Sequence, residues 1–350
     1  MPITYSIIIP TLNQSAKLKL CLAHLANLNF DPDAFEVLVI DNGSTDDTKG
    51  MTESNAGIIK NLCYHYCAEP GLMAARHMGA EKAQGDILCY LDDDSLVTIE
   101  WLQGMAESFS RDDVVIAGGP CIPKYEAPPP DWGDYFWSET EYGKNNGFLS
   151  LVDFGNEFKM IPPVYIYGCN FSIRKGVFLE NGGTLPDYYP PGMYQYIGDG
   201  ESGLSLKLQR KGFLAAYNPK ARIDHLIPSS RLTLDYLCWK RYYNGIHGSY
   251  HDVRMQHGLD GCDHISVVVH TIRRPLGRVK RYILSVLRAS GFFYATAPTE
   301  PPEVVSMKRK IEESFHAGYA FHQESLQKDP KLLEWVLRPD YLGKNGKLPL

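Results

Sequence analysis

Within the first 120 residues, short apolar runs alternate with helical patterns, and this alternation limits the fold more than any other feature of the chain. The apolar runs lie at residues 5–10, 36–40, near 62–66 and 87–91. Between them, stretches such as 15–28 and 72–84 place apolar residues at helical spacing. Continuous apolar strands that alternate with helices predict a parallel sheet that is covered by helices on both faces.

Acidic residues follow two of these predicted strands. Asp41 comes after the second strand, and Asp92-Asp93-Asp94 come after the fourth. Because ligands of such sheets bind at the carboxyl ends of the strands, we expect these side chains at one crevice. Three adjacent carboxylates repel one another unless a cation lies among them, and oxygen ligands suit Mg²⁺ or Mn²⁺. If the segment is extended, Asp92 and Asp94 point the same way. The alternative is a solvated acidic turn or a cap of a helix over 95–106.

The rest of the chain is less regular. We expect strands at 164–173 and 213–217 and helices at 201–211 and 303–328. Residues 273–290 form a basic stretch with one apolar helical face. This stretch either lies on an anionic membrane surface or packs its apolar face on the rest of the protein.

Composition excludes several classes of protein. Lys and Arg number 35 against 41 Asp and Glu, so the net charge is −6, and we expect no nucleic-acid partner. No apolar run reaches the roughly 18 residues of a membrane-spanning helix, and the N-terminus is typical of a buried strand rather than a signal peptide. The eight cysteines form no CxxC pair, which favours reduced thiols in the cytoplasm. Peripheral contact with the inner face of the membrane, through 273–290, is left open.

Several segments, in the expected order, resemble the family 2 glycosyltransferases, which are inverting enzymes with a GT-A fold. The resemblance covers roughly residues 5–250 and rests first on the segments SIIIPTLNQSAKLKLCL, VLVIDNGSTDDT and EPGLMAARHMGAEKAQGDILCYLDDDSLV. It implies a Rossmann-like, mostly parallel sheet with helices on both faces. It also implies a catalytic domain over 1–230, with a nucleotide-binding half over 1–120 and an acceptor-binding half over 121–230. A mainly helical extension follows over 231–350.

The resemblance assigns residues to the donor. The expected nucleotide is UDP, with Asp41 against its uracil base. The residues expected to contact the nucleotide or its diphosphate are Pro10, Thr11, Asn13, Asp41, Arg76, Asp92, Asp93 and Arg231. Asp94, together with Asp92 and His225, is expected to hold Mn²⁺ or Mg²⁺, which would stabilise the departing diphosphate. The alternatives are a turn residue for Asp41, a surface cation for Arg76 and structural roles for His225 and Arg231.

The resemblance also points to the acceptor side. In VYIYGCNFSI, Gly168 and Asn170 are expected near the sugar, unless this is a core strand with a packing glycine. Inverting transfer needs one carboxylate to accept the proton of the acceptor hydroxyl. The family usually supplies a Glu-Asp pair, but here Ser202 follows Glu201. Glu201, which matches the family's Glu, is our first choice and Asp199 our second. The two side chains could share a face if the segment is extended. The alternative is that both only cap the following helix.

The sequence therefore predicts a metal-dependent enzyme that moves a sugar from a nucleotide-diphosphate donor to a hydroxyl of a glycan or lipid-linked acceptor. A non-catalytic sugar- or nucleotide-binding protein on the same scaffold is one alternative, and Ser202 is its best support. A nucleotidyltransferase is the other alternative, but the loop after the first strand has no glycine to hold phosphates. The oligomeric state stays open.

Overall fold

The computed structural model describes residues 3–259 and 300–349, and the chain divides into two compact units. Unit 1 comprises Met1–Lys124, Gly155–Leu226 and Arg338–Leu350, and unit 2 comprises Tyr125–Phe154 and Ile227–Leu337. The basic stretch at 273–290 lies outside the described residues, so its expected contact stays a prediction. The boundaries expected for the catalytic domain and its halves also stay predictions.

Unit 1 is built on an eight-stranded sheet with the strand order β11-β13-β6-β12-β4-β1-β2-β3. The strands are β1 (Tyr5–Thr11), β2 (Phe35–Asp41), β3 (Leu62–Tyr66), β4 (Ile87–Leu91), β6 (Ile116–Gly118), β11 (Lys159–Ile161), β12 (Asn170–Arg174) and β13 (Ala215–Tyr217). The first four strands pair in parallel, which confirms the expected sheet. β12 and β11 run antiparallel to their neighbours, so the sheet is mixed at its other end.

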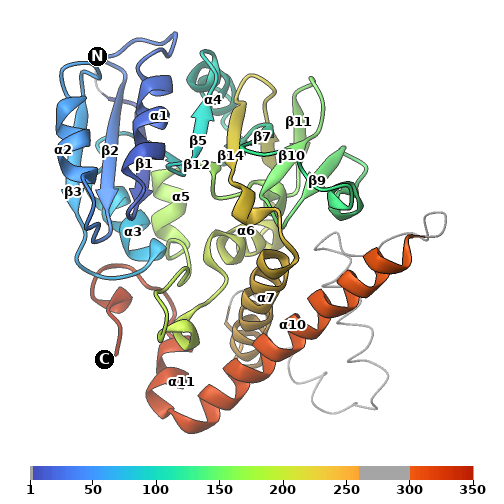
Figure 1. Cartoon of the computed structure of the whole chain (residues 1–350). Coiled ribbons are helices and arrows are strands. Elements are labelled where there is room, and N and C mark those ends of the chain that lie inside the picture. The colour runs from blue at the N-terminus through green and yellow to red at the C-terminus, as the bar shows by residue number, and fades with distance from the viewer. Residues whose placement is uncertain (1–2, 260–299, 350) are drawn as a thin grey trace. The chain divides into compact units, whose positions relative to one another are not determined.

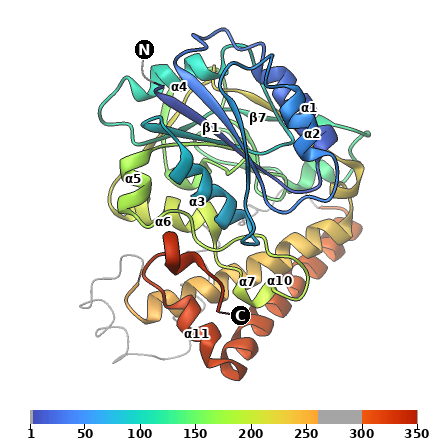
Figure 2. The same cartoon turned by 90° about the vertical axis from the view of Figure 1, so that its left-hand side faces the viewer.

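The side chains of β1 alternate between the two faces of this sheet, and both faces are apolar, so helices cover both. Ile7 and Ile9 share a buried cluster with Leu18 and Leu22 of α1 (Ser15–Leu25). Ile8 points to the other face, where α3 (Leu72–Lys82) packs so closely that a Cβ on Gly79 would overlap the Ile8 side chain. Figure 2 shows α1 and α2 (Thr48–Ser54) on one side of β1 and α3 on the other.

The remaining elements of unit 1 are β5 (Ser95–Val97), α4 (Trp101–Phe109), β7 (Cys121–Tyr125), η2 (Pro163–Tyr165), α5 (Lys175–Glu180), η3 (Tyr194–Tyr196), α6 (Gly200–Arg210), β14 (Ile223–Ile227) and η5 (Gly343–Gly346). The strand expected over 164–173 is only partly correct. The 3-10 helix η2 occupies the first residues of this range, and the strand β12 begins only at Asn170. Proline at 162 and 163 explains this, since it fixes φ and cannot donate a ladder hydrogen bond. α6 and α10 match the helices expected from the sequence.

Unit 2 combines a small antiparallel sheet with long helices (Figure 1). Its elements are η1 (Gly133–Phe136), β8 (Ser138–Glu139), β9 (Lys144–Asn146), β10 (Leu151–Asp153), η4 (Ser229–Arg231), α7 (Leu234–Gln256), α10 (Pro302–Lys328) and α11 (Pro330–Val336). Two glycines let α7 and α10 cross backbone to backbone. A Cβ on Gly245 would overlap the Phe315 carbonyl oxygen, and one on Gly318 would overlap the Tyr242 carbonyl oxygen.

Two expectations about the chain as a whole can be compared with the described residues. None of the described helices is long and apolar enough to cross a bilayer. The seven cysteines within the described ranges are free thiols, as expected. The nearest two, Cys121 and Cys169, are buried with their sulfur atoms 3.8 Å apart.

Candidate active site at the carboxyl edge of the sheet

The carboxyl ends of β4, β1 and β2 lie side by side at one edge of the unit 1 sheet. Thr11, the last residue of β1, is the register partner of Asp41, the last residue of β2. Thr11 also donates a hydrogen bond from Oγ1 to Asp93 Oδ2 at 2.7 Å, which ties the end of β1 to the turn after β4. The acidic groups therefore gather at one edge, as the strand pattern predicted.

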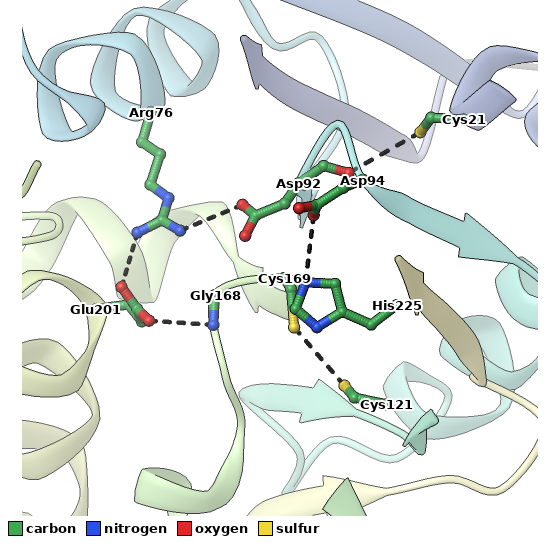
Figure 3. Close-up of polar contacts among 9 residues, drawn as sticks. All are labelled: Cys21, Arg76, Asp92, Asp94, Cys121, Gly168, Cys169, Glu201 and His225. Carbon is green, nitrogen blue, oxygen red and sulfur yellow. Dashed lines mark hydrogen bonds and ion pairs between the residues drawn. The ribbon is translucent and has the colours of Figure 1, made fainter. Parts of the chain in front are cut away.

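Asp92, Asp93 and Asp94 do not continue β4 as an extended segment. Asp93 and Asp94 form a turn, so the condition under which Asp92 and Asp94 would point the same way is not met. The turn sends each carboxylate to a different partner. Asp92 lies 3.7 Å from Arg76 Nη2, and Asp94 lies 3.3 Å from His225 Nε2 (Figure 3). Asp93 accepts from Thr11.

The three carboxylates also affect one another's ionisation. Burial raises the pKa of Asp92, and the nearby Arg76 guanidinium opposes that rise. Burial and the charge of Asp94 raise the pKa of Asp93 to about 8, despite the hydrogen bond from Thr11. Burial and neighbouring negative charge thus disfavour the ionised forms of Asp92 and Asp93.

Asp94 and His225 meet because β5 pairs with β14 in antiparallel register, which places Ser95 opposite His225. Their side chains are only 5% and 4% exposed. Among the described residues, no three His, Cys, Asp or Glu side chains form a ready ligand set. Two neighbouring ligands, one carboxylate and one imidazole, still fit a divalent cation that takes the rest of its shell from water and phosphate.

Arg76 stands at the centre of a buried ion cluster. Its side chain is 3% exposed, and Nη1 donates to Glu201 Oε2 at 2.8 Å while Nη2 faces Asp92. Burial would lower the pKa of Arg76, but the carboxylates of Glu201, Asp92 and Asp187 raise it above its usual value. The guanidinium therefore stays charged, and it joins the acidic turn after β4 to the start of α6.

Gly168 completes the surroundings of Glu201. Its backbone N–H donates to Glu201 Oε1 at 3.1 Å. A Cβ at this position would lie 2.8 Å from that oxygen and would overlap Arg76 Nη2, so any larger residue would displace the Arg76–Glu201 ion pair. Arg76, Gly168 and Glu201, which the sequence assigned to three separate roles, are therefore brought into one contact group.

Asp199 and Glu201 do not share a face of an extended segment, so that expectation is wrong. Asp199 is the N-cap residue of α6, and Glu201 lies in its first turn. The buried Asp199 carboxylate packs against Gly203, where a Cβ would lie 2.5 Å from Oδ1. Glu201 remains 19% exposed. Of the two proposed bases, only Glu201 is partly accessible to an acceptor and lies beside the acidic turn.

Asp187 is a residue of this cluster that the sequence analysis missed. Its carboxylate packs over the start of α6, where a Cβ on Gly200 would lie 2.6 Å from Oδ2. Its backbone carbonyl accepts from the N–H of Leu72, the first residue of α3. Asp187 is the single acidic residue of the loop 185–198, which is the one signal that the sequence offered.

Two residues expected to bind the nucleotide, Asp41 and Asn13, both accept from the turn at residues 44–45. Asp41 is 2% exposed, and its oxygens accept from Ser44 N–H at 2.8 Å and from the Tyr64 hydroxyl at 2.7 Å. Asn13 has a φ of 55° and accepts from Thr45 N–H at 2.7 Å. Tyr64 is a second residue that the sequence analysis missed, and its place on β3 gave no signal.

Two further predicted residues have other surroundings. Asn170 is buried, accepts from Trp101 Nε1 at 2.9 Å and donates to the Ala221 carbonyl at 2.8 Å, which are the contacts of a core residue. Arg231 lies in η4 of unit 2. The contacts of Asn170 with a sugar and of Arg231 with a diphosphate stay predictions.

Comparisons with known proteins agree with this architecture. Residues 6–178 match the family model described as glycosyl transferase family 2. The glucosyl-dolichyl phosphate glucuronosyltransferase of Haloferax volcanii is 24% identical over 216 residues, which are 60% of this chain and 65% of the relative's length. The succinoglycan biosynthesis protein ExoM of Rhizobium meliloti is 24% identical over 64% of this chain and 67% of that protein.

Solved structures show the same fold. The mannosyltransferase PcManGT from Pyrobaculum calidifontis, solved with GDP-Man and Mn²⁺, has a TM-score of 0.52 at 15% identity, over 96% of this chain and 85% of that chain. GalNAc-T7, solved with UDP, GalNAc and Mn²⁺, has a TM-score of 0.50 at 18% identity, over 76% of this chain and 53% of that chain. Through residues 6–178 this chain belongs to glycosyl transferase family 2, and it has the GT-A fold.

Proposed function

We propose that this chain is an inverting glycosyltransferase that moves a sugar from a nucleotide-diphosphate donor, with UDP as the nucleotide, to an acceptor hydroxyl. Glu201 is the base. The observation that carries the proposal is the contact group of Glu201, Arg76 and Gly168 beside the acidic turn at 92–94. A buried charged cluster at the carboxyl edge of a sheet is costly to build, and such clusters are found where chemistry needs them.

The contacts of Glu201 are those expected of a general base. An ion pair with a buried guanidinium requires the carboxylate to be ionised, and a general base must be ionised to accept a proton. The Glu201 side chain is also 19% exposed, so an acceptor can approach the carboxylate. The acceptor hydroxyl gives its proton to Glu201, its oxygen bonds to the anomeric carbon, and the nucleotide diphosphate leaves with the electrons of the broken bond.

The donor would lie along the edge formed by β4, β1 and β2, against Pro10, Thr11, Asn13 and Asp41, with residues of 121–230 facing the acceptor. Asp94 and His225 would hold Mn²⁺ or Mg²⁺, assisted by Asp92. When bound there, such an ion supplies Lewis-acid stabilisation of the charge on the diphosphate. The chain itself holds these side chains at fixed positions. The hydrogen bond from Thr11 to Asp93 helps to fix the turn that carries them.

A glycan or a lipid-linked sugar is the acceptor that we propose. The name of the Haloferax relative describes transfer onto a glucosyl-dolichyl phosphate, and the name of the Rhizobium relative describes succinoglycan biosynthesis. Both names fit transfer to a sugar hydroxyl that is already part of a larger carrier. The described residues do not identify the donor sugar.

The test is transfer from a panel of UDP- and GDP-sugars with Mn²⁺, for the wild type and for two variants. Glu201→Gln should lower kcat by about 10²-fold or more, because it removes the proton acceptor but keeps the shape. Asp199→Asn, the matched control at the N-cap of α6, should change kcat by less than about tenfold. Nucleotide binding without turnover for any donor would identify a non-catalytic binding protein, and a loss caused by Asp199→Asn alone would move the base to that residue.

A further inference from the structure

We propose that Arg76 is a positioning residue, which fixes the carboxylate of Glu201 for proton transfer instead of binding the nucleotide itself. The inference rests on the proposed role of Glu201 as the base. It departs from the sequence prediction, which placed Arg76 against the nucleotide. The departure follows from where the structure puts the guanidinium group.

The Glu201 carboxylate is held from two directions. Arg76 Nη1 donates to Oε2 at 2.8 Å, and the Gly168 N–H donates to Oε1 at 3.1 Å (Figure 3). Two donors on two oxygens fix the rotation of the carboxylate about its last torsion, which is otherwise broad for glutamate. A fixed orientation matters because a misplacement of about 1 Å can cost 10²-fold in rate.

Burial separates the positioning role from a binding role. The side chain of Arg76 is 3% exposed, so little of it is available to a ligand. Both terminal nitrogens already face carboxylates, Nη1 toward Glu201 and Nη2 toward Asp92. A positive charge in this place offsets the repulsion between the base and the acidic turn. Its removal would leave buried carboxylates close together without a counter-charge.

The planar guanidinium group of Arg76 can contact two carboxylates at once, which this position requires. One planar group reaches Glu201 through one nitrogen and Asp92 through another, so the base and the donor-binding turn keep a constant separation. A lysine carries the charge but has a single nitrogen on a flexible stem. We therefore expect Arg76→Lys to keep the fold and to lose part of the rate.

The experiment measures kcat, the KM of the donor and the dissociation constant of UDP with Mn²⁺, for Arg76→Ala and Arg76→Lys, alone and combined with Glu201→Gln. Arg76→Ala should lower kcat by about 10²-fold while the UDP dissociation constant stays within about twofold. Added guanidinium ion should restore part of the rate of Arg76→Ala. In the Glu201→Gln background, Arg76→Ala should cost almost nothing more, because its effect acts through Glu201.

Lys82→Ala is the matched control, since Lys82 is an exposed cation on the same helix. It should leave all three quantities unchanged. If Arg76→Ala fails to fold, Arg76→Lys carries the test, with UDP binding as the evidence of folding.

Three results would overturn the inference. A weaker UDP affinity at unchanged kcat would make Arg76 a nucleotide contact, and losses that multiply in the double variant would make it independent of Glu201. A wild-type rate for Arg76→Lys would show that the two-nitrogen contact of the guanidinium group does not position Glu201. By contrast, a wild type that transfers no sugar, or a Glu201→Gln variant that keeps its rate, would contradict the proposed function itself.

Discussion

One cluster of buried side chains in unit 1 is charged, and one cluster in unit 2, beside the buried arginines of α7, is neutral. In unit 1, Arg76 contacts the carboxylates of Glu201 and Asp92. In unit 2, Ser249 Oγ lies 2.6 Å from His322 Nδ1 and accepts from Gln323 Nε2 at 2.9 Å. Burial lowers the pKa of His322 to about 4, and nearby His247 adds to this effect, so the imidazole is neutral at pH 7.

The two clusters differ in what their burial costs and in where they lie in the fold. A neutral hydrogen-bonded group satisfies a helix interface at low cost, whereas a buried charge is expensive even when it is paired. The cluster in unit 2 joins α7 to α10, where glycines already bring the two backbones together. The cluster in unit 1 lies at the edge of the sheet where parallel-sheet proteins bind ligands.

The largest effect should come from the charged cluster. Asp94→Asn should weaken Mn²⁺-dependent UDP binding by about 100-fold or more, because it removes a negative oxygen ligand from the proposed metal position. The measurement is calorimetry with UDP, with and without Mn²⁺. Asp224→Asn is the control, since Asp224 precedes His225 on β14 and its carboxylate pairs with Arg222. Unchanged Mn²⁺-dependent binding in Asp94→Asn would refute the metal assignment.

A packing change in unit 2 should act on stability alone. Gly318→Ala should lower the free energy of unfolding by about 2–3 kcal/mol, because its Cβ would overlap the Tyr242 carbonyl oxygen. Gly248→Ala, on the same helix pair, meets only side-chain atoms, of Phe315 at 3.2 Å and of Tyr319 at 3.7 Å, and should be nearly neutral. Urea unfolding measures both. Equal stabilities of the two variants would show that the helices do not cross as closely as described.

The neutral cluster should make stability depend on pH. His322 has a folded pKa near 4 and a usual value of 6.5, so the unfolded chain takes up its proton first as the pH falls. Its stabilising contribution is complete above pH 6.5 and is lost between pH 6.5 and 4. The advantage of wild type over His322→Gln in urea unfolding should therefore shrink by about 2 kcal/mol between pH 7 and pH 4.5. A constant advantage would mean that His322 is not neutral when folded.

The smallest effect should come from a helix end. Thr233 caps α7, and its hydroxyl accepts from the Tyr236 N–H at 3.2 Å. Thr233→Ala should lower the free energy of unfolding by about 1 kcal/mol, and Thr233→Ser should restore most of it. Thermal unfolding of the three proteins measures this. Sugar transfer should not change, and a loss of rate in Thr233→Ala would show that unit 2 affects the reaction.

Much of the fold could be predicted because local patterns carry it. The apolar runs of β1, β2 and β4 and the helical spacing of α1 and α10 are visible in the sequence alone. The strand expected over 164–173 was too long, because the conformation of Pro162 and Pro163 outweighed its β-branched content. Asp187 was missed because it lies in an irregular loop, where no periodicity indicates what the chain packs against.

The candidate site divides in the same way. The sequence by itself determined which chemical groups stand at the carboxyl ends of the strands, because a strand's end and its next residue are adjacent in the chain. Only the tertiary structure decided their partners. The turn at 92–94 sends Asp92 to Arg76 and Asp94 to His225, and α6 brings Glu201 to an arginine 125 positions away. Side-chain direction depends on backbone torsions and on neighbours from distant segments, and neither is set by local composition.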